Sequence, residues 1–174
     1  SFGHGITTPL LQLAKAYAII TNGGYKISPT TILKTRNLND KKKILNDEVS
    51  KKILPILRKI VTTEEGTASL ANVSGYEIGG KTGTAQKSIS GSYSKKKINT
   101  FVSIFPISNP KFVLAVMLDE PKTNKDYIYN YRDGSNIKYK GPPFNTAGWT
   151  SVEVAGQIIE KIGPILATKY KEIN

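Results

Sequence analysis

Three stretches of the chain place apolar residues at the three- and four-residue spacing of an amphipathic helix. The first helix is expected between Thr8-Pro9 and Asn22–Gly24, since proline suits a first turn and glycine suits the residue after a last turn. A second is expected from Asp47, which can cap it, and Pro55 should kink or split it. A third is expected from Thr150, because Thr150–Glu153 matches a capping box.

Strand signals are concentrated in the middle of the chain. Asn99–Pro106 is rich in Phe, Val and Ile, and Lys111–Asp119 contains seven consecutive apolar residues. The short connection Ile107–Pro110 makes these two strands an antiparallel hairpin, because a parallel pair needs a crossover of about a dozen residues or more. Tyr76–Gln86 is expected as a third antiparallel strand, at an edge of the same sheet.

Two polar stretches, Lys87–Lys97 and the Tyr-rich Glu120–Gly148, lack any period and are expected as loops. The order of the remaining elements is two helices, three strands and a helix. It predicts an α/β (α+β) fold in which helices flank an antiparallel sheet. With 174 residues, the chain is expected to belong to one domain, spanning residues 1–174.

Composition narrows the function classes. The chain is 39% hydrophobic and 22% charged, which is typical of a globular protein. It has no Cys, so disulfide scaffolds and cysteine nucleophiles are excluded, and its single His, His4, argues against a Ser-His-Asp triad. We therefore expect no metal site and no cofactor. The longest apolar run, Phe112–Leu118, is far shorter than the ~20 residues of a membrane helix, and the N-terminus does not resemble a signal peptide.

The net charge of +12 raises the question of a nucleic-acid partner. However, 22 of the 25 basic residues are Lys, whereas reading of base edges depends largely on Arg. The clusters Lys41–Lys43 and Lys95–Lys97 lie in polar stretches typical of solvated loops. We expect no nucleic-acid partner.

Gly75–Thr82 matches G-x-x-x-x-G-K-[ST], the phosphate-binding loop of P-loop NTPases. Phe112–Leu118 followed by Asp119 looks like the strand whose Asp holds Mg²⁺ in those enzymes. Such a loop needs a buried strand before it and a helix directly after it. Here Ser69–Ser74 lacks strand character and Gly83–Gly91 lacks a helical apolar stripe. An NTPase is kept as the alternative hypothesis.

Lys81-Thr82-Gly83 is also the K-T-G motif of β-lactamases and penicillin-binding proteins. On a strand, Lys81 and Gly83 would lie on one face and Thr82 on the other. A cation and hydroxyl groups there can bind a substrate carboxylate by charge-assisted hydrogen bonds. Gly83 leaves room for a peptide to lie along the strand. The tripeptide by itself is weak, but the longer string Gly80–Gln86 is much more specific.

The chain resembles the C-terminal part of the transpeptidase domain of a class B penicillin-binding protein. Nearly the whole sequence carries the resemblance, in strings that follow the family order: Ser1–Gly5, Thr8–Tyr17, Asn22–Gly24, Glu65–Ala68, Gly79–Gln86, Phe101–Pro106 and Phe112–Pro121. Asp119–Pro121 and Ala147–Val152 are similar to the division-specific, FtsI-type enzymes. His4 departs from the family pattern, which has an aromatic residue or Gln there.

The resemblance implies a parent protein that is a peptidoglycan D,D-transpeptidase, cross-linking stem peptides by serine acyl transfer in septal cell-wall synthesis. Lys81 would then supply positive charge and proton transfer near the nucleophile. The hydroxyls of Thr82 and Thr84 would bind the terminal carboxylate of a substrate lying along Gly83. The backbone N–H of Thr84 would be one of two oxyanion donors.

Two of the family's three catalytic motifs are missing. The nucleophile belongs to a Ser-x-x-Lys upstream of the strings above, and no Ser-x-Asn occurs. Four Ser-x-x-Lys matches begin after Lys81, in segments expected as loops or turns, and we interpret them as coincidences in a Lys-rich chain: Ser92, Ser94, Ser108 and Ser135. The chain alone should be catalytically incomplete, with the nucleophile-bearing N-terminal part absent. A non-catalytic binding descendant of the fold is a third hypothesis.

The expected partners follow from the resemblance: stem peptides ending in D-Ala-D-Ala, β-lactam antibiotics and, as further candidates, cell-division proteins. The location would be the periplasmic face of the bacterial inner membrane, with an anchor outside this chain. Without the rest of the domain, apolar faces of the Thr8–Thr21 helix and of the sheet should be uncovered. We therefore also expect the chain to self-associate.

Overall fold

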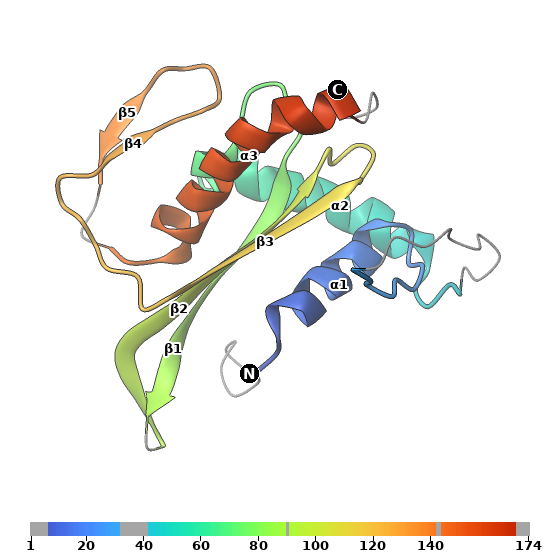
Figure 1. Ribbon diagram of the computed structural model, residues 1–174, viewed down its shortest axis with the longest axis horizontal. Helices are drawn as coiled ribbons and strands as arrows, with labels where there is room; N and C mark the ends of the chain where they lie inside the picture. The colour runs from blue at the N-terminus through green and yellow to red at the C-terminus, as the bar shows by residue number, and fades with distance from the viewer. Residues whose placement is uncertain (1–6, 32–41, 90, 142–143, 170–174) are drawn as a thin grey trace.

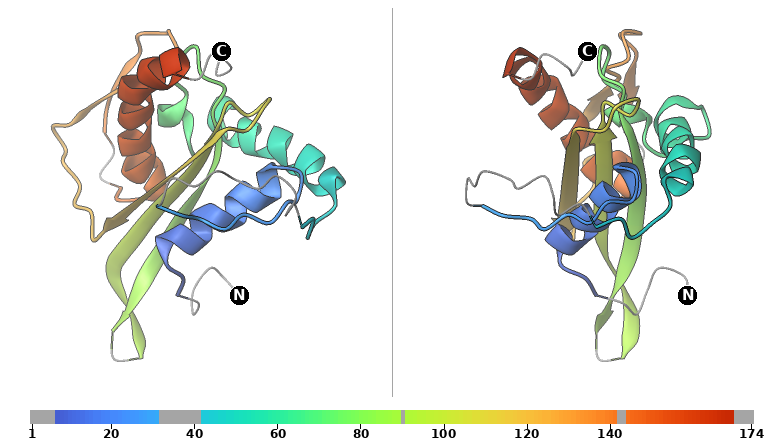
Figure 2. Two further views of the ribbon diagram at one scale, coloured as in Figure 1. Left: turned by 45° about the vertical axis from the view of Figure 1, so that its right-hand side comes forward. Right: turned by 90° about the vertical axis from the view of Figure 1, so that its right-hand side faces the viewer.

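The main sheet has three antiparallel strands in the order β1-β2-β3, with helices on both faces (Figure 1). The computed structural model describes residues 7–31, 42–89, 91–141 and 144–169. Helix α3 covers one face, and α1 and α2 cover the other (Figure 2). The elements in chain order are α1 (Leu10–Thr21), α2 (Asp47–Thr62), η1 (Ser69–Ala71), β1 (Gly79–Ile89), β2 (Ser92–Phe105), β3 (Phe112–Asp119), β4 (Ile128–Asn130), β5 (Lys138–Lys140), η2 (Ala147–Trp149) and α3 (Ser151–Lys169). The expected fold class is confirmed.

The first two helices form where expected, with small differences at their ends. Pro9 directly precedes α1, and Gly23 follows its end with φ of 86°, a left-handed conformation that favours glycine. Asn46, rather than Asp47, caps α2, because the Asn46 side chain accepts a hydrogen bond from the Glu48 N–H. Pro55 does not split α2; it lies on the exposed side of the helix, where water can satisfy the carbonyl left without a donor.

The expectation of a loop over Lys87–Lys97 is wrong. Strands β1 and β2 continue as a long hairpin, pairing from Gly79↔Ile104 to Ile89↔Ser92 with one register shift between Gln86 and Ser88. The hairpin extends beyond β3, which pairs with Ile98–Phe105 of β2 (Figure 1). Lys95–Lys97 therefore lie on a strand, although Lys95 and Lys96 are exposed as expected of a solvated segment.

Alternate residues of β2 face two different cores, one on each side of the sheet. Phe101 is fully buried against Val152 and Ile159 of α3. Ile104 is fully buried on the opposite side, where it packs with Leu57 of α2. These two cores fix the register of β2, and hence of the neighbouring edge strand β1.

The expectation of a long loop over Glu120–Gly148 is also wrong in part, because β4 and β5 pair within it and η2 closes it. Its aromatic residues pack on one another: the rings of Tyr129 and Tyr139 lie 5.0 Å and 5.4 Å from the ring of Trp149. The Tyr129 hydroxyl donates to the Trp149 carbonyl. This packing buries Tyr129, whereas Tyr139 stays 46% exposed.

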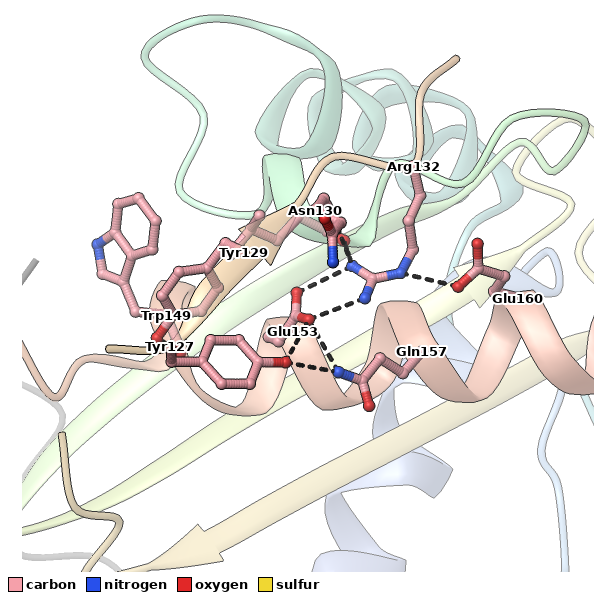
Figure 3. A network of polar contacts seen from close by, with 9 residues as sticks. Tyr127, Tyr129, Asn130, Arg132, Trp149, Glu153, Gln157 and Glu160 are labelled. Atoms are coloured by element: carbon pink, nitrogen blue, oxygen red, sulfur yellow. Dashed lines mark hydrogen bonds and ion pairs between the residues drawn. The ribbon is translucent and has the colours of Figure 1, made fainter. Parts of the chain in front are cut away.

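A buried ion pair fastens the same segment to α3 (Figure 3). The guanidinium of Arg132 donates two hydrogen bonds to the carboxylate of Glu153, with nitrogen–oxygen distances of 2.8 Å and 2.9 Å. Tyr127 and Gln157 donate to the same carboxylate. Glu153 is thus engaged by Arg132 and Tyr127, which are distant in sequence, and by Gln157 on the next turn of α3, so this network replaces the capping box expected at Thr150–Glu153.

No helix in the described part of the chain is long and apolar enough to cross a membrane. Several features singled out in the sequence lie outside the described residues, namely His4, the string Ser1–Gly5 and Lys41.

Candidate functional site

The candidate site lies on β1, an edge strand that pairs with β2 on one side. The edge position and the antiparallel order of the three strands agree with the prediction. Thr82 pairs with Phe101 and therefore belongs to the face that carries α3, as does Thr84. Lys81 and Gly83 belong to the other face, as expected. An edge strand leaves backbone groups available for an extended peptide.

A cavity of about 320 Å³ lies beside Thr82 and Thr84, between β1, η1 with the residues just before it, and η2. Five hydroxyl-bearing side chains line it: Thr67, Ser69, Thr82, Thr84 and Thr146. Among the residues that the structure describes, no acidic side chain lines this cavity. Hydroxyl groups donate well to a carboxylate, so the lining suits a small anionic end of a ligand.

Two contacts hold the threonines of β1 in this cavity. The Thr82 and Thr67 hydroxyl oxygens are 2.9 Å apart, within hydrogen-bond distance. The backbone N–H of Ala147 donates to the Thr84 hydroxyl oxygen at 3.0 Å. Thr67 and Ala147 were missed as site residues. Both lie in strings that carry the family resemblance, Glu65–Ala68 and Ala147–Val152, but position along the chain does not show that these strings meet β1.

Lys81 does not share the hydroxyl-lined cavity. Its side chain is exposed, and its Nζ donates to the carbonyl of Thr82 at 2.8 Å. The positive charge therefore lies close to the strand, beside the residue whose hydroxyl enters the cavity. Thr82 and Thr84 are brought together, whereas Lys81 presents its charge from the other face.

Two glycines of β1, Gly80 and Gly83, differ in what surrounds them. A Cβ at Gly80 would lie 2.6 Å from the Phe101 ring and from the Val102 carbonyl, so Gly80 is required by packing. A Cβ at Gly83 would have its nearest neighbour, Thr100, at 3.9 Å. Because Gly83 is exposed and internal packing does not require a glycine there, its bare surface is available to a ligand.

The geometry is incompatible with a phosphate-binding loop at Gly75–Thr82. Lys81 and Thr82 lie within a strand, and β1 continues to Ile89 where a helix would have to begin. The carboxylate of Asp119 accepts a hydrogen bond from Lys87 at 3.0 Å rather than standing near Lys81.

The four Ser-x-x-Lys matches do not form a nucleophile site. Ser92 and Ser94 lie on β2, which corrects the expectation of a loop there. Ser108 and Ser135 lie in bends, as expected. None of the four begins a helix, which is where the family would place its nucleophile.

Comparison with known proteins agrees with this picture. The sequence model of one protein family, the penicillin-binding protein transpeptidase domain, matches residues 1–138. A probable peptidoglycan D,D-transpeptidase FtsI from Caulobacter vibrioides is 32% identical over 98% of this chain and 28% of its own. A peptidoglycan D,D-transpeptidase FtsI from Buchnera aphidicola is 40% identical over 73% of this chain and 23% of its own.

Solved structures show the same fold. The transpeptidase domain of penicillin-binding protein 3 from Burkholderia pseudomallei has a TM-score of 0.71 at 29% identity, covering 98% of this chain and 45% of that one. Penicillin-binding protein 3 from Mycobacterium tuberculosis, solved with aztreonam, has a TM-score of 0.65 at 25% identity, covering 92% and 36%. The chain thus spans less than a third of the two curated relatives and less than half of these solved structures.

Proposed function

The chain belongs to the penicillin-binding protein transpeptidase domain family, and we propose that the protein containing it is a peptidoglycan D,D-transpeptidase. Residues 1–174 would be the C-terminal portion of its transpeptidase domain, and the nucleophilic serine would lie in a part of that domain outside this chain. The observation that carries the proposal is the hydroxyl-lined cavity beside an edge strand bearing Lys81-Thr82-Gly83.

The proposed reaction is acyl transfer through a covalent ester. The serine oxygen attacks the carbonyl carbon of the D-Ala-D-Ala bond, and the departing D-Ala amine takes up a proton. An amine of a second stem peptide then attacks the ester, forming the cross-link and returning the serine. The chain also supplies one wall of the site against which the stem peptide lies.

Four consecutive residues of β1, Lys81–Thr84, have roles in the proposed reaction. Thr82 and Thr84 hold the terminal carboxylate of the substrate by their hydroxyls. The Thr84 backbone N–H is one of two donors to the oxyanion that forms as the serine attacks. Lys81 supplies positive charge and proton transfer near the serine, and Gly83 lets the peptide approach the strand.

The proposal includes partners and location. Stem peptides ending in D-Ala-D-Ala are the substrates, and β-lactam antibiotics are inhibitors, as the structures of relatives with aztreonam and ampicillin support. The FtsI relatives support a role in septal wall synthesis with cell-division proteins as partners. That role places the site on the periplasmic face of the inner membrane, with an anchor outside this chain.

Acylation by a fluorescent penicillin tests the proposal in the full-length protein that contains this chain. Lys81→Ala should lower the acylation rate constant by on the order of a hundredfold, as loss of a group acting in the transition state does. Lys95→Ala is the matched control, because Lys95 is an exposed lysine on the neighbouring strand, and it should leave the rate unchanged.

The melting temperatures of both variants should match that of the wild type, since both side chains are exposed. Full-length protein that is never acylated, or that is equally acylated with and without Lys81, contradicts the proposal. Binding of a D-Ala-D-Ala peptide without acylation would instead favour the non-catalytic descendant of the fold.

A further inference from the structure

Asn99 is a polar side chain buried completely in the centre of the sheet. It lies on β2 directly across from Thr84, and its exposed fraction is 0%. A buried amide costs stability unless its hydrogen bonds are made, so its presence needs an explanation other than packing.

The amide nitrogen of Asn99 uses both of its hydrogens on one segment. It donates to the carbonyl of Asn145 at 3.1 Å and to the hydroxyl of Thr150 at 2.8 Å. Its orientation is fixed by these neighbours, because a carbonyl only accepts and the Thr150 hydroxyl gives its own proton to the Thr146 carbonyl at 2.9 Å. The Asn99 Oδ1, by contrast, is buried with no hydrogen-bond partner in the described part of the chain.

The two bonds of Asn99 fasten both ends of a short segment whose middle touches the candidate site. Ala147 lies between Asn145 and Thr150, and its N–H donates to the Thr84 hydroxyl oxygen. Because that oxygen accepts from Ala147, the hydroxyl proton of Thr84 remains for another acceptor, and Thr84 lines the hydroxyl-bearing cavity. Asn99 lies opposite Thr84 on the neighbouring strand, and its hydrogen bonds to segment 145–150 connect it to Thr84 a second time, through Ala147.

We propose that Asn99 is a positioning residue that acts on the substrate carboxylate through Ala147 and Thr84. This inference rests on the proposed function. Asn99 holds segment 145–150 so that the Ala147 N–H orients the Thr84 hydroxyl, whose proton then points to the carboxylate. Both donors of the Asn99 amide are engaged by this segment.

A direct test measures the Ala147 amide in the chain itself by hydrogen exchange. In Asn99→Ala the exchange of that amide should be about tenfold faster than in wild type, because its segment loses the two hydrogen bonds from Asn99. Ser103→Ala is the matched control: Ser103 is equally buried on the same strand and face, but it donates to the Leu114 carbonyl of β3. Ser103→Ala should leave the exchange rate of the Ala147 amide as it is in wild type.

A second test uses penicillin acylation of the full-length protein. Asn99→Ala should slow acylation about tenfold, since small misplacements of a site group cost rate steeply, while Ser103→Ala stays within about twofold. In a Thr84→Val background, which removes the acceptor of the Ala147 N–H, Asn99→Ala should cause no further loss. This non-additivity is the signature of action through Thr84.

The outcomes separate the two proposals. A wild-type protein that is not acylated refutes the proposed function, while the exchange of Ala147 still decides the positioning role. Unchanged Ala147 exchange in Asn99→Ala, or a fully additive double variant, overturns the inference. If Asn99→Ala fails to fold, Thr150→Val removes one acceptor of the Asn99 amide and keeps a side chain of similar shape. It should also speed Ala147 exchange and slow acylation, both by less than Asn99→Ala would.

Discussion

Replacing Arg132 by Met should destabilise the chain strongly, because it leaves a buried carboxylate without its cation. The side chains of Arg132 and Glu153 are 6% and 5% exposed, and two hydrogen bonds of 2.8 Å and 2.9 Å join them (Figure 3). Arg132 also donates to the carbonyls of Leu70 and Asn130. After the substitution, Glu153 keeps the hydrogen bonds from Tyr127 and Gln157 and no counter-charge.

The expected size follows from this geometry. Removing one partner of a buried ion pair costs about 3–5 kcal/mol, because the remaining charge is stranded in a medium of low dielectric constant. For a chain of this length, each 1 kcal/mol lowers the melting temperature by roughly 2–4 °C. Arg132→Met should therefore lower it by roughly 6–20 °C.

The fluorescence of Trp149, the single tryptophan, reports the transition from within the same region, since its ring packs on Tyr129. Lys43→Met is the control, because it breaks an exposed pair with Asp47 and should leave the melting temperature unchanged. Adding Glu153→Gln to Arg132→Met should recover part of the loss, since it removes the stranded charge.

The pH dependence of the chain's stability is a second test of the Arg132–Glu153 ion pair. Burial by itself raises the pKa of Glu153, but the hydrogen bonds from Arg132, Gln157 and Tyr127 and the charge of Arg132 outweigh it, so the pKa lies below its usual value. The stabilisation is therefore present above about pH 4.5 and is lost as pH falls through the lowered pKa. In Arg132→Met burial dominates instead, so its deficit should shrink as pH falls.

Two results would refute this reasoning. One is an Arg132→Met variant that melts no lower than Lys43→Met at neutral pH. The other is a deficit that does not change between neutral and acid pH, since the stranded charge of Glu153 should disappear on protonation.

The other predictions concern the candidate site and the surface. Saturating ATP with Mg²⁺ should not raise the melting temperature; a clear Mg²⁺-dependent shift would revive the NTPase hypothesis. Gly80→Ala should destabilise by about 1–3 kcal/mol through its clash with Phe101. Gly83→Ala should leave the melting temperature unchanged yet slow penicillin acylation of the full-length protein; unchanged acylation would show that no ligand approaches there. Leu11 on α1 and Met117 on β3 are 63% and 48% exposed, and sedimentation at high concentration should show dimers or larger species rather than a monomer.

Local patterns were sufficient to predict the elements that determine the sheet. The apolar run at Phe112–Leu118 and the short connection before it specify an antiparallel pair, whatever packs on it. The cores around Phe101 and Ile104 then follow from strand alternation. The position of Lys81–Gly83 on an edge strand followed from the motif together with these neighbours.

Long-range contacts explain what the sequence did not predict. Lys87–Lys97 has the composition of a loop, but Ser88 and Ile89 pair across the hairpin with Tyr93 and Ser92, and Lys87 bonds to Asp119 and Glu120. Thr150–Glu153 matches a local capping pattern, but Arg132 binds the carboxylate instead. Similarly, the contact of Ala147 with Thr84 joins residues 63 positions apart, which no spacing rule reveals.

The string Gly75–Thr82 shows why a motif needs its structural context. A phosphate loop works because several N–H groups at a helix N-terminus converge on an anion. Here the same residue types enter an extended strand, where successive N–H groups point to opposite sides and cannot converge. In the proposed function the anion is bound instead by hydroxyls on separate segments, with Thr67 and Thr82 at 2.9 Å and Thr84 held by Ala147. The strand that continues from Lys81-Thr82-Gly83 therefore excludes a phosphate loop, and it is the geometry that the proposed binding of a peptide carboxylate requires.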